Sequence, residues 1–180
     1  MNSKMGVVEL RTKFLALILT ITITTIVYAQ ENTNNWEKLN FLIGDWKGEG
    51  SGNPGEGEGI FSFKYDLNYK ILLRKSHSEY PAAKDKPLIV HEDLMIIYLD
   101  YFGNPNRAIY FDNEGHVINY SITFPNNNDV VFTSDKIPNA PIFRLTYSKI
   151  ESDLLNVKFE MSQDGENYQA YVEGRSKRQK

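Results

Sequence analysis

The chain has 180 residues, of which 41% are hydrophobic and 13% aromatic, and its formal net charge is −3 at pH 7. This mild acidity argues against nucleic acid and anionic membrane surfaces as partners, because both require a basic face. The sequence contains no cysteine, which excludes disulfides, thiol nucleophiles and thiolate metal sites.

The N-terminus is typical of a secretory signal peptide. Lys4, Arg11 and Lys13 precede an apolar run from Phe14 to Val27, and a small-residue site ends at Ala29. A membrane-spanning helix needs about 20 apolar residues, and this run is shorter. We therefore expect residues 1–29 to be a signal peptide that is cleaved after Ala29.

Cleavage would leave residues 30–180 as one domain, a length that can bury a sizeable core. The sequence predicts a periplasmic or secreted protein. Removal of three basic residues and one acidic residue with the signal makes the remaining chain more acidic. We expect it to bind no nucleic acid and to have no membrane insertion.

The predicted elements begin with a short helix. Trp36 to Ile43 carries apolar residues at 36, 39, 42 and 43, a spacing that fits one or two helical turns. Extended segments bounded by turn residues follow. The clearest is Gly59 to Leu67, where Phe61, Phe63 and Tyr65 alternate with polar residues, as expected of a half-buried strand.

The remaining predicted strands share this short length and are mostly joined by short turns. They are residues 44–52, 71–80, 88–101, 107–111, 116–124, 130–134, 142–150, 154–162 and 168–177. About ten such strands favour an all-β fold, a single closed antiparallel up-and-down β-barrel with a short N-terminal helix. Both faces of the 88–101 strand are apolar, so its inward face stays open.

The first strand opens with the sequence GDWKGEGSG. Alternation places Gly44, Trp46, Gly48, Gly50 and Gly52 on one face. A face of glycines indicates a sharp bend or a close neighbour, since glycine otherwise weakens a strand. The tryptophan would fill the base of the barrel.

This G-x-W-x-G-x-G-x-G pattern resembles the signature of the nitrobindins, small calycin-type β-barrels that bind haem. The chain is also similar to exported bacterial proteins that carry this opening and a strand like VHEDLMIIY. More broadly, the opening resembles lipocalin and fatty-acid-binding barrels, in which a basic residue of the last strand packs over the tryptophan. The resemblance implies that role for Arg175.

Nitrobindins hold the haem iron with a histidine near the C-terminus, and residues 117–180 here contain no histidine. The resemblance therefore implies the barrel and leaves the cofactor unknown, with haem as one candidate.

The three histidines lack the mutual spacing of metal ligands, so no metal site is predicted. His91 shares a strand face with Asp93, and a carboxylate can orient an imidazole and raise its basicity. His116 begins the face that carries Tyr120, which would place it at one end of the lumen. His77 lies beside Glu79 on its own strand face.

An apolar lumen with a few polar groups predicts a binding module for a small apolar molecule. The candidate ligand contacts are Trp46, Phe61, Phe63, Tyr65, His91, His116 and Tyr120. The candidate structural residues are Gly44, Gly48, Gly50, Gly52 and Arg175.

Three alternatives remain open at this point. The first is a haem-binding, nitrobindin-like protein that uses one of the three histidines. The second is an enzyme in which His91 and Glu92 or Asp93 perform acid–base chemistry on a ligand in the lumen. The third is a filled barrel that acts through its outer surface. The usual nucleophile motifs are absent, so no catalytic residue is assigned.

Overall fold

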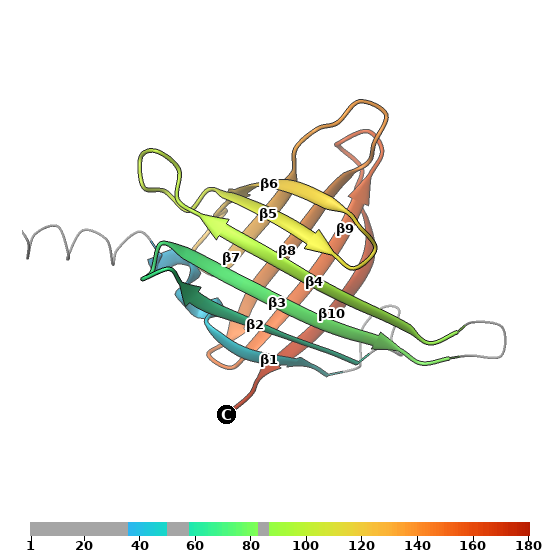
Figure 1. Cartoon of the computed structure of the whole chain (residues 1–180), viewed down its shortest axis with the longest axis horizontal. Coiled ribbons are helices and arrows are strands. Elements are labelled where there is room, and N and C mark those ends of the chain that lie inside the picture. The colour runs from blue at the N-terminus through green and yellow to red at the C-terminus, as the bar shows by residue number, and fades with distance from the viewer. Residues whose placement is uncertain (1–35, 50–57, 83–86) are drawn as a thin grey trace, which may run out of the picture. The chain divides into compact units, whose positions relative to one another are not determined.

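The computed structural model describes residues 36–49, 58–82 and 87–180. Within them, one short 3-10 helix, η1 (Glu37–Leu42), precedes ten antiparallel strands that close into a barrel (Figure 1). The strands are β1 (Gly44–Gly48), β2 (Glu58–Asp66), β3 (Ile71–Tyr80), β4 (Ile89–Tyr98), β5 (Arg107–Asp112), β6 (Val117–Thr123), β7 (Asp129–Ser134), β8 (Ile142–Glu151), β9 (Leu154–Ser162) and β10 (Gln169–Arg178).

The predicted all-β barrel with a short helix is confirmed. Each strand pairs with the next along the chain, and β10 pairs with β1, which makes the barrel up-and-down. The predicted signal peptide, residues 1–29, and the predicted strand glycines Gly50 and Gly52 lie outside the described residues. Among the described residues, no helix is long and apolar enough to cross a membrane.

The strand pairing settles which face of β4 points inward. Arg74 of β3 lies opposite Phe63 of β2 on one side and Met95 of β4 on the other, and all three are buried. Since directly opposed residues of an antiparallel pair share a face, the odd-numbered residues of β4 point into the lumen. His91 and Asp93 therefore face inward, as Met95 does.

One end of the barrel is capped by η1, and we call it the capped end. Trp46 is 1% exposed, and its Nε1 donates a hydrogen bond to the Leu42 carbonyl of η1 at 2.8 Å. The Arg178 guanidinium lies over the Trp46 ring, 4.1 Å from its centroid. It also donates to the carbonyls of Phe41, at 2.9 Å, and Ile43. These contacts join both chain ends of the barrel.

The prediction that Arg175 packs over Trp46 was wrong, because Arg178 occupies that place. Arg178 lies directly opposite Trp46 in the ladder, whereas Arg175 is exposed and has the other strand parity. Side chains alternate between faces along a strand, so a shift of three residues reverses the direction.

The structure explains why the first strand begins with a glycine at position 44. Its φ is +126°, a backbone conformation that residues with a Cβ rarely adopt. A Cβ at this position would also lie 2.6 Å from Nη1 of Arg178. The glycine thus allows the arginine to reach the carbonyls of Phe41 and Ile43.

The turn between β2 and β3 is unusual because three consecutive non-glycine residues have positive φ. Leu67, Asn68 and Tyr69 have φ values of 48°, 54° and 62°. Such left-handed conformations are unfavourable for residues with a Cβ. The turn leaves Leu67 65% and Tyr69 64% exposed at the capped end.

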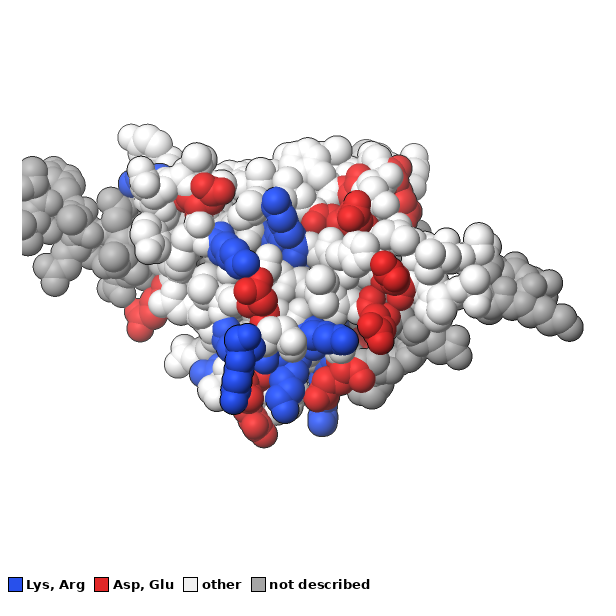
Figure 2. All heavy atoms as spheres, turned by 60° about the horizontal axis from the view of Figure 1, so that its bottom comes forward, with Lys and Arg blue, Asp and Glu red and all other residues white. Residues whose placement is uncertain are grey.

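The face of the barrel in Figure 2 carries basic and acidic side chains that are interspersed. Lys64 and Asp45 form an ion pair at 2.8 Å, and Lys47 and Glu58 approach to 3.7 Å. All four side chains are about half exposed or more, so such pairs contribute little to stability.

The Arg178 contacts generate a stability prediction. We expect Arg178→Ala to lower the free energy of unfolding by about 2–3 kcal/mol, because it removes a cation–π contact and leaves two carbonyls without their donor. Urea titration followed by circular dichroism measures this. Arg175→Ala is the matched control, expected within about 0.5 kcal/mol of wild type. Equal effects of the two substitutions would contradict the assignment of Arg178.

Candidate functional site

The inward side chains of the barrel form two levels that differ in burial. Toward the capped end they are almost completely buried and form the core, including Phe63, Leu72, Met95, Ile97, Ala108, Tyr120, Phe132, Tyr147 and Leu155. Toward the opposite end, which carries the hairpin 113–116 and which we call the mouth, they are half-buried. These residues include Phe61, Ser76, Ser78, His91, Tyr110, Ile118, Phe143, Met161 and Val172.

An inward side chain can be reached by solvent only from the lumen. The mouth half of the lumen is therefore accessible, whereas the capped half is filled. The polar side chains that enter the lumen gather where the two halves meet.

A buried ion pair lies at this boundary. Arg74 Nη1 donates to Asp93 Oδ1, and the two side chains are 9% and 5% exposed. His91 Nε2 lies 3.7 Å from the other Asp93 oxygen. Buried charges are costly unless they are paired, so each member of this pair depends on the other.

The guanidinium has hydrogen-bonding capacity that the protein does not use. Arg74 Nη1 donates to Asp93, and Tyr147 lies near the guanidinium and raises its pKa. Arg74 Nε is buried without a hydrogen-bond partner, and the hydroxyl of Tyr147 is in the same state. Phe61 covers one side of the guanidinium, with its ring centroid 5.6 Å away. Buried polar atoms without partners are rare in proteins and call for an explanation.

The same corner of the lumen connects to the mouth through a chain of polar contacts. His91 Nε2 lies 3.0 Å from the Tyr110 hydroxyl, and His91 Nδ1 lies 3.1 Å from Glu114. The Tyr110 hydroxyl also donates to Asp112 at 3.4 Å. The chain runs from an exposed carboxylate at the rim to a half-buried phenol.

The tyrosines of the lumen are held in the neutral form. Burial, followed by the charges of Asp93 and Asp112, raises the pKa of Tyr110 well above its ordinary value. Burial also raises the pKa of Tyr147, to about 12, although the charge of Arg74 acts in the opposite direction. Both hydroxyls are therefore protonated at neutral pH and can donate hydrogen bonds.

Arg74 remains charged despite its burial. Burial alone would lower the pKa of Arg74, but Tyr147 and Asp93 outweigh it and raise the pKa above the ordinary value. The boundary between the two halves of the lumen thus holds a permanent cation.

Asp112 organises the hairpin at the mouth. Its Oδ1 accepts hydrogen bonds from the backbone N–H groups of Glu114, at 3.0 Å, and His116, at 2.9 Å. Its Oδ2 lies 2.9 Å from His116 Nδ1. Gly115 has a φ of +90°, which the turn requires. Burial raises the pKa of Asp112, but the hydrogen bonds and charge of His116 outweigh burial and lower it overall.

The structure describes all three histidines and places them in different surroundings. His91 points into the lumen opposite Ser78, and its side chain is 27% exposed. The side chain of His116 is 61% exposed on the mouth hairpin. His77 lies on the outer face, where hydrogen bonds from its ring to Glu79 and then Glu92 raise its pKa.

The other candidate contacts are less accessible than the sequence suggests. Trp46, Phe63 and Tyr120 are 1%, 0% and 2% exposed within the filled half. Tyr65 lies at the capped end, where its hydroxyl donates to Asn40 at 2.7 Å. Of the candidate contacts, the structure brings Phe61 and His91 to the accessible half.

Arg74, Tyr110 and Tyr147 are members of the site that sequence reasoning missed. A basic residue between the apolar pairs of the segment ILLRKS was the available signal for Arg74. Alternation puts Arg74 on the same strand face as Leu72 and Ser76. The sequence of this segment does not show that this face is inward, because that depends on how β3 pairs with β2 and β4.

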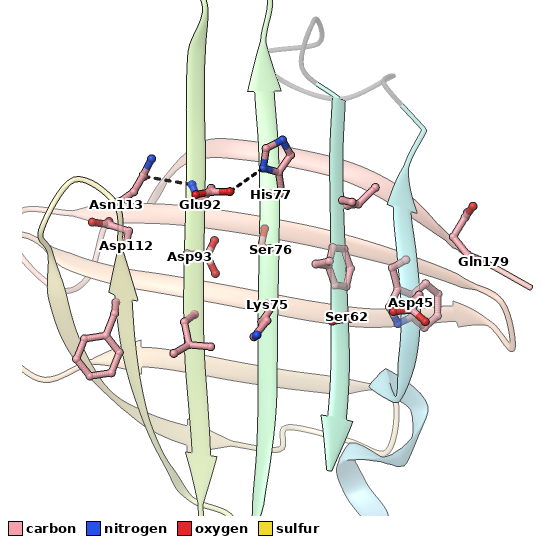
Figure 3. A pocket seen from close by; sticks show the side chains of 15 residues that line it. Asp45, Ser62, Lys75, Ser76, His77, Glu92, Asp93, Asp112, Asn113 and Gln179 are labelled. Atoms are coloured by element: carbon pink, nitrogen blue, oxygen red, sulfur yellow. Dashed lines mark hydrogen bonds and ion pairs between the residues drawn. The ribbon is translucent and has the colours of Figure 1, made fainter. Parts of the chain in front are cut away.

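A hollow of about 690 Å³ lies against the outer face of the barrel, and the strand residues that line it include Phe61, Ser76 and Asp93, whose side chains point inward. Within the described part of the chain, its lining comes from β1–β5, Asn113 and Gln179, and no residue of β6–β9 contributes. A hollow inside the lumen would touch those facing strands. Figure 3 shows His77 and Glu92 in front of their strands, with Asn113 beside them.

The outer hollow has the chemistry of a solvated surface. His77 lies 3.2 Å from Glu92, whose backbone N–H donates to the Asn113 side chain at 3.1 Å. Each of these polar groups has a partner near bulk solvent. The lumen, by contrast, holds buried donors without acceptors, so we regard it as the candidate site. Among the described residues, no group of three or more His, Cys, Asp or Glu side chains could hold a metal ion.

Comparisons with known proteins support the fold. No family model matches the chain, and no curated protein matches it. The structure is similar to the crystal structure of Rv2717c from M. tuberculosis, with a TM-score of 0.53 and 13% sequence identity. The similarity covers 82% of this chain and 98% of that chain. At this identity the likeness shows the barrel fold alone.

The Asp112 hairpin generates a prediction on pH dependence. Because the pKa of Asp112 is lowered in the folded protein, its carboxylate contributes stability above the ordinary aspartate value of about 3.9, and this is lost as pH falls through the lower folded value. We expect Asp112→Asn to be less stable than wild type at about pH 6, with the difference shrinking toward about pH 3. Urea unfolding across this range measures it. Glu166→Gln, an exposed change on another hairpin, is the control and should leave the pH profile of stability unchanged. A stability difference between Asp112→Asn and wild type that stays constant with pH would contradict the prediction.

Proposed function

We propose that this protein is a small-molecule-binding β-barrel whose ligand enters the mouth and stops above the filled core. The observation that carries the proposal is the change in burial along the lumen: most inward residues are half-buried at the mouth, and most of those toward the capped end are buried. Closed barrels commonly bind ligands in such mouths.

The walls of the mouth suit a ligand with an apolar body. Phe61, Ile118, Phe143 and Met161 point inward and are half-buried. Arg74, His91 and Tyr110 supply polar groups at the base. An apolar wall with a few placed polar groups is the usual anatomy of a small-molecule site.

Haem does not fit the residues present, although the glycine-rich opening supports a nitrobindin-like origin of the barrel. Both ring nitrogens of His91 are hydrogen-bonded, to Tyr110 and Glu114. His116 is largely exposed on the hairpin, and His77 lies on the outer face.

An acid–base enzyme is less well supported than a binding module. A Glu114–His91–Tyr110 relay would need a phenol that ionises readily. Burial and the neighbouring carboxylates instead raise the pKa of Tyr110. The relay therefore positions Tyr110 as a neutral donor, which is a binding role.

We further propose that the protein acts outside the cytoplasm. The support is the arrangement of Lys4, Arg11 and Lys13 before the apolar run 14–27 and the site ending at Ala29. Intact mass analysis of the protein from its native host should show a chain that starts at Gln30. A full-length mass in the mature fraction would contradict this.

Binding in the mouth can be tested with the uncharged dye Nile red, whose fluorescence rises in apolar surroundings. We expect saturable binding by wild type, and at least about tenfold weaker binding by Ile118→Trp, because a larger ring fills the accessible half. Fluorescence titration measures both affinities.

Leu94→Trp is the matched control, since Leu94 lines the hollow on the outer face. It should bind the dye as wild type does. If Leu94→Trp weakens binding and Ile118→Trp does not, the outer hollow is the binding site and the proposal fails. Circular dichroism confirms that each variant is folded.

A further inference from the structure

We propose that the lumen selects an uncharged ligand that presents an acceptor oxygen, such as an amide or ketone carbonyl, to the guanidinium of Arg74, and that it rejects carboxylates. This inference rests on the proposed function and names the ligand class of the same site.

The corner around Arg74 has more donors than acceptors. Nη1 bonds Asp93, whereas Nε and the Tyr147 hydroxyl are buried without partners. No hydrogen bond joins Nη2 to a described residue. Arg74 is 8% exposed, so only a small part of the residue is accessible. A further acceptor atom would satisfy the donors that remain in this corner.

The fixed charges of the lumen argue against an anion as that acceptor. Arg178 lies at the capped end, so Arg74 is the one permanent cation among the described inward side chains of the mouth half and the boundary, and Asp93 already neutralises it. Asp112, 4% exposed, adds a second carboxylate on the same face. An incoming carboxylate would lose its water shell and meet two like charges at low dielectric, which costs more than one guanidinium returns.

A neutral carbonyl avoids that cost. It can accept from the charged guanidinium, a stronger hydrogen bond than one between neutral groups. Tyr147 reinforces this preference, because its hydroxyl stays protonated and has no partner. The polar base of the lumen thus offers donors and a slightly negative field at once.

The outer face provides a matched comparison. Glu160 is 4% exposed and bonds Arg144 at 2.8 Å and Lys158 at 3.0 Å. Arg144 also lies 3.7 Å from the ring centroid of Tyr168. Neither residue of this Arg–Glu pair has a buried polar atom without a partner. The Arg74–Asp93 pair differs from it because it keeps free donors and faces the lumen.

The test uses a matched pair of probes, 2-naphthamide and 2-naphthoate, which share one apolar body. Isothermal titration at about pH 8, above the ordinary range of imidazole groups, removes charge on histidine as a variable. We expect the amide to bind at least about tenfold more tightly, and Arg74→Lys to lose most of that affinity, since the fork geometry is lost. Arg144→Lys should bind both probes as wild type does.

A second variant tests the cause of the selectivity. Asp93→Asn frees the charge of Arg74, and the preference should move toward 2-naphthoate by at least about tenfold. Glu160→Gln is its control and should leave the preference unchanged. If Asp93→Asn does not fold, the chemical shift of the Arg74 Nε–H in wild type decides, because the amide should move it and the acid should not.

The outcomes separate the two proposals. Equal binding of the probes, or tighter binding of 2-naphthoate, overturns the selectivity while leaving a ligand site in the lumen. Amide binding that is indifferent to Arg74→Lys also overturns it. Failure of both probes, together with no binding of Nile red, overturns the lumen as a binding site and this inference with it.

Discussion

The structure depends on the closure between β1 and β10. Three residue pairs join these strands, and backbone hydrogen bonds from Glu49 to Arg175 and from Gln179 to Asp45 extend the contact. Arg178 reinforces the closure from inside, through the Trp46 ring and the carbonyls of Phe41 and Ile43. Without the closure between β1 and β10, two strand edges would be open and one end of the core would be uncovered.

Closure also explains why the lumen can hold charge. Core residues fill the capped half, and the mouth half receives polar side chains that water reaches only through one end. Arg74 and Asp93 lie between these environments, where their mutual attraction is weakly screened. The same position makes every unused hydrogen-bond donor costly, so an acceptor that arrives with a ligand has a strong effect.

The sequence was sufficient to predict the barrel, because its information is local. The alternation of Phe61, Phe63 and Tyr65 and the regular turn signals define strands of about the right length and number. The spacing in Trp36 to Ile43 indicates the short helix in the same way. These features need no knowledge of which segments meet.

The site was less accessible to sequence reasoning, because it depends on register between distant segments. Arg74 and Asp93 are brought together by the β3–β4 ladder, and both faces of β4 are apolar enough to point inward. The choice between Arg175 and Arg178 also turned on strand parity. A bulge between Ala170 and Val172 interrupts the regular ladder of β10, so counting from the previous hairpin does not determine that parity.

The turn at Leu67, Asn68 and Tyr69 has a consequence for the order of folding. Three successive left-handed residues are seldom populated together in a free chain, so the β2–β3 hairpin has little tendency to form by itself. The β5–β6 hairpin is different, since Gly115 takes the positive φ and Asp112 bonds across the turn. Assembly of the barrel is therefore expected to start on the side of the lumen that carries Tyr110, with the strand of Arg74 added afterwards.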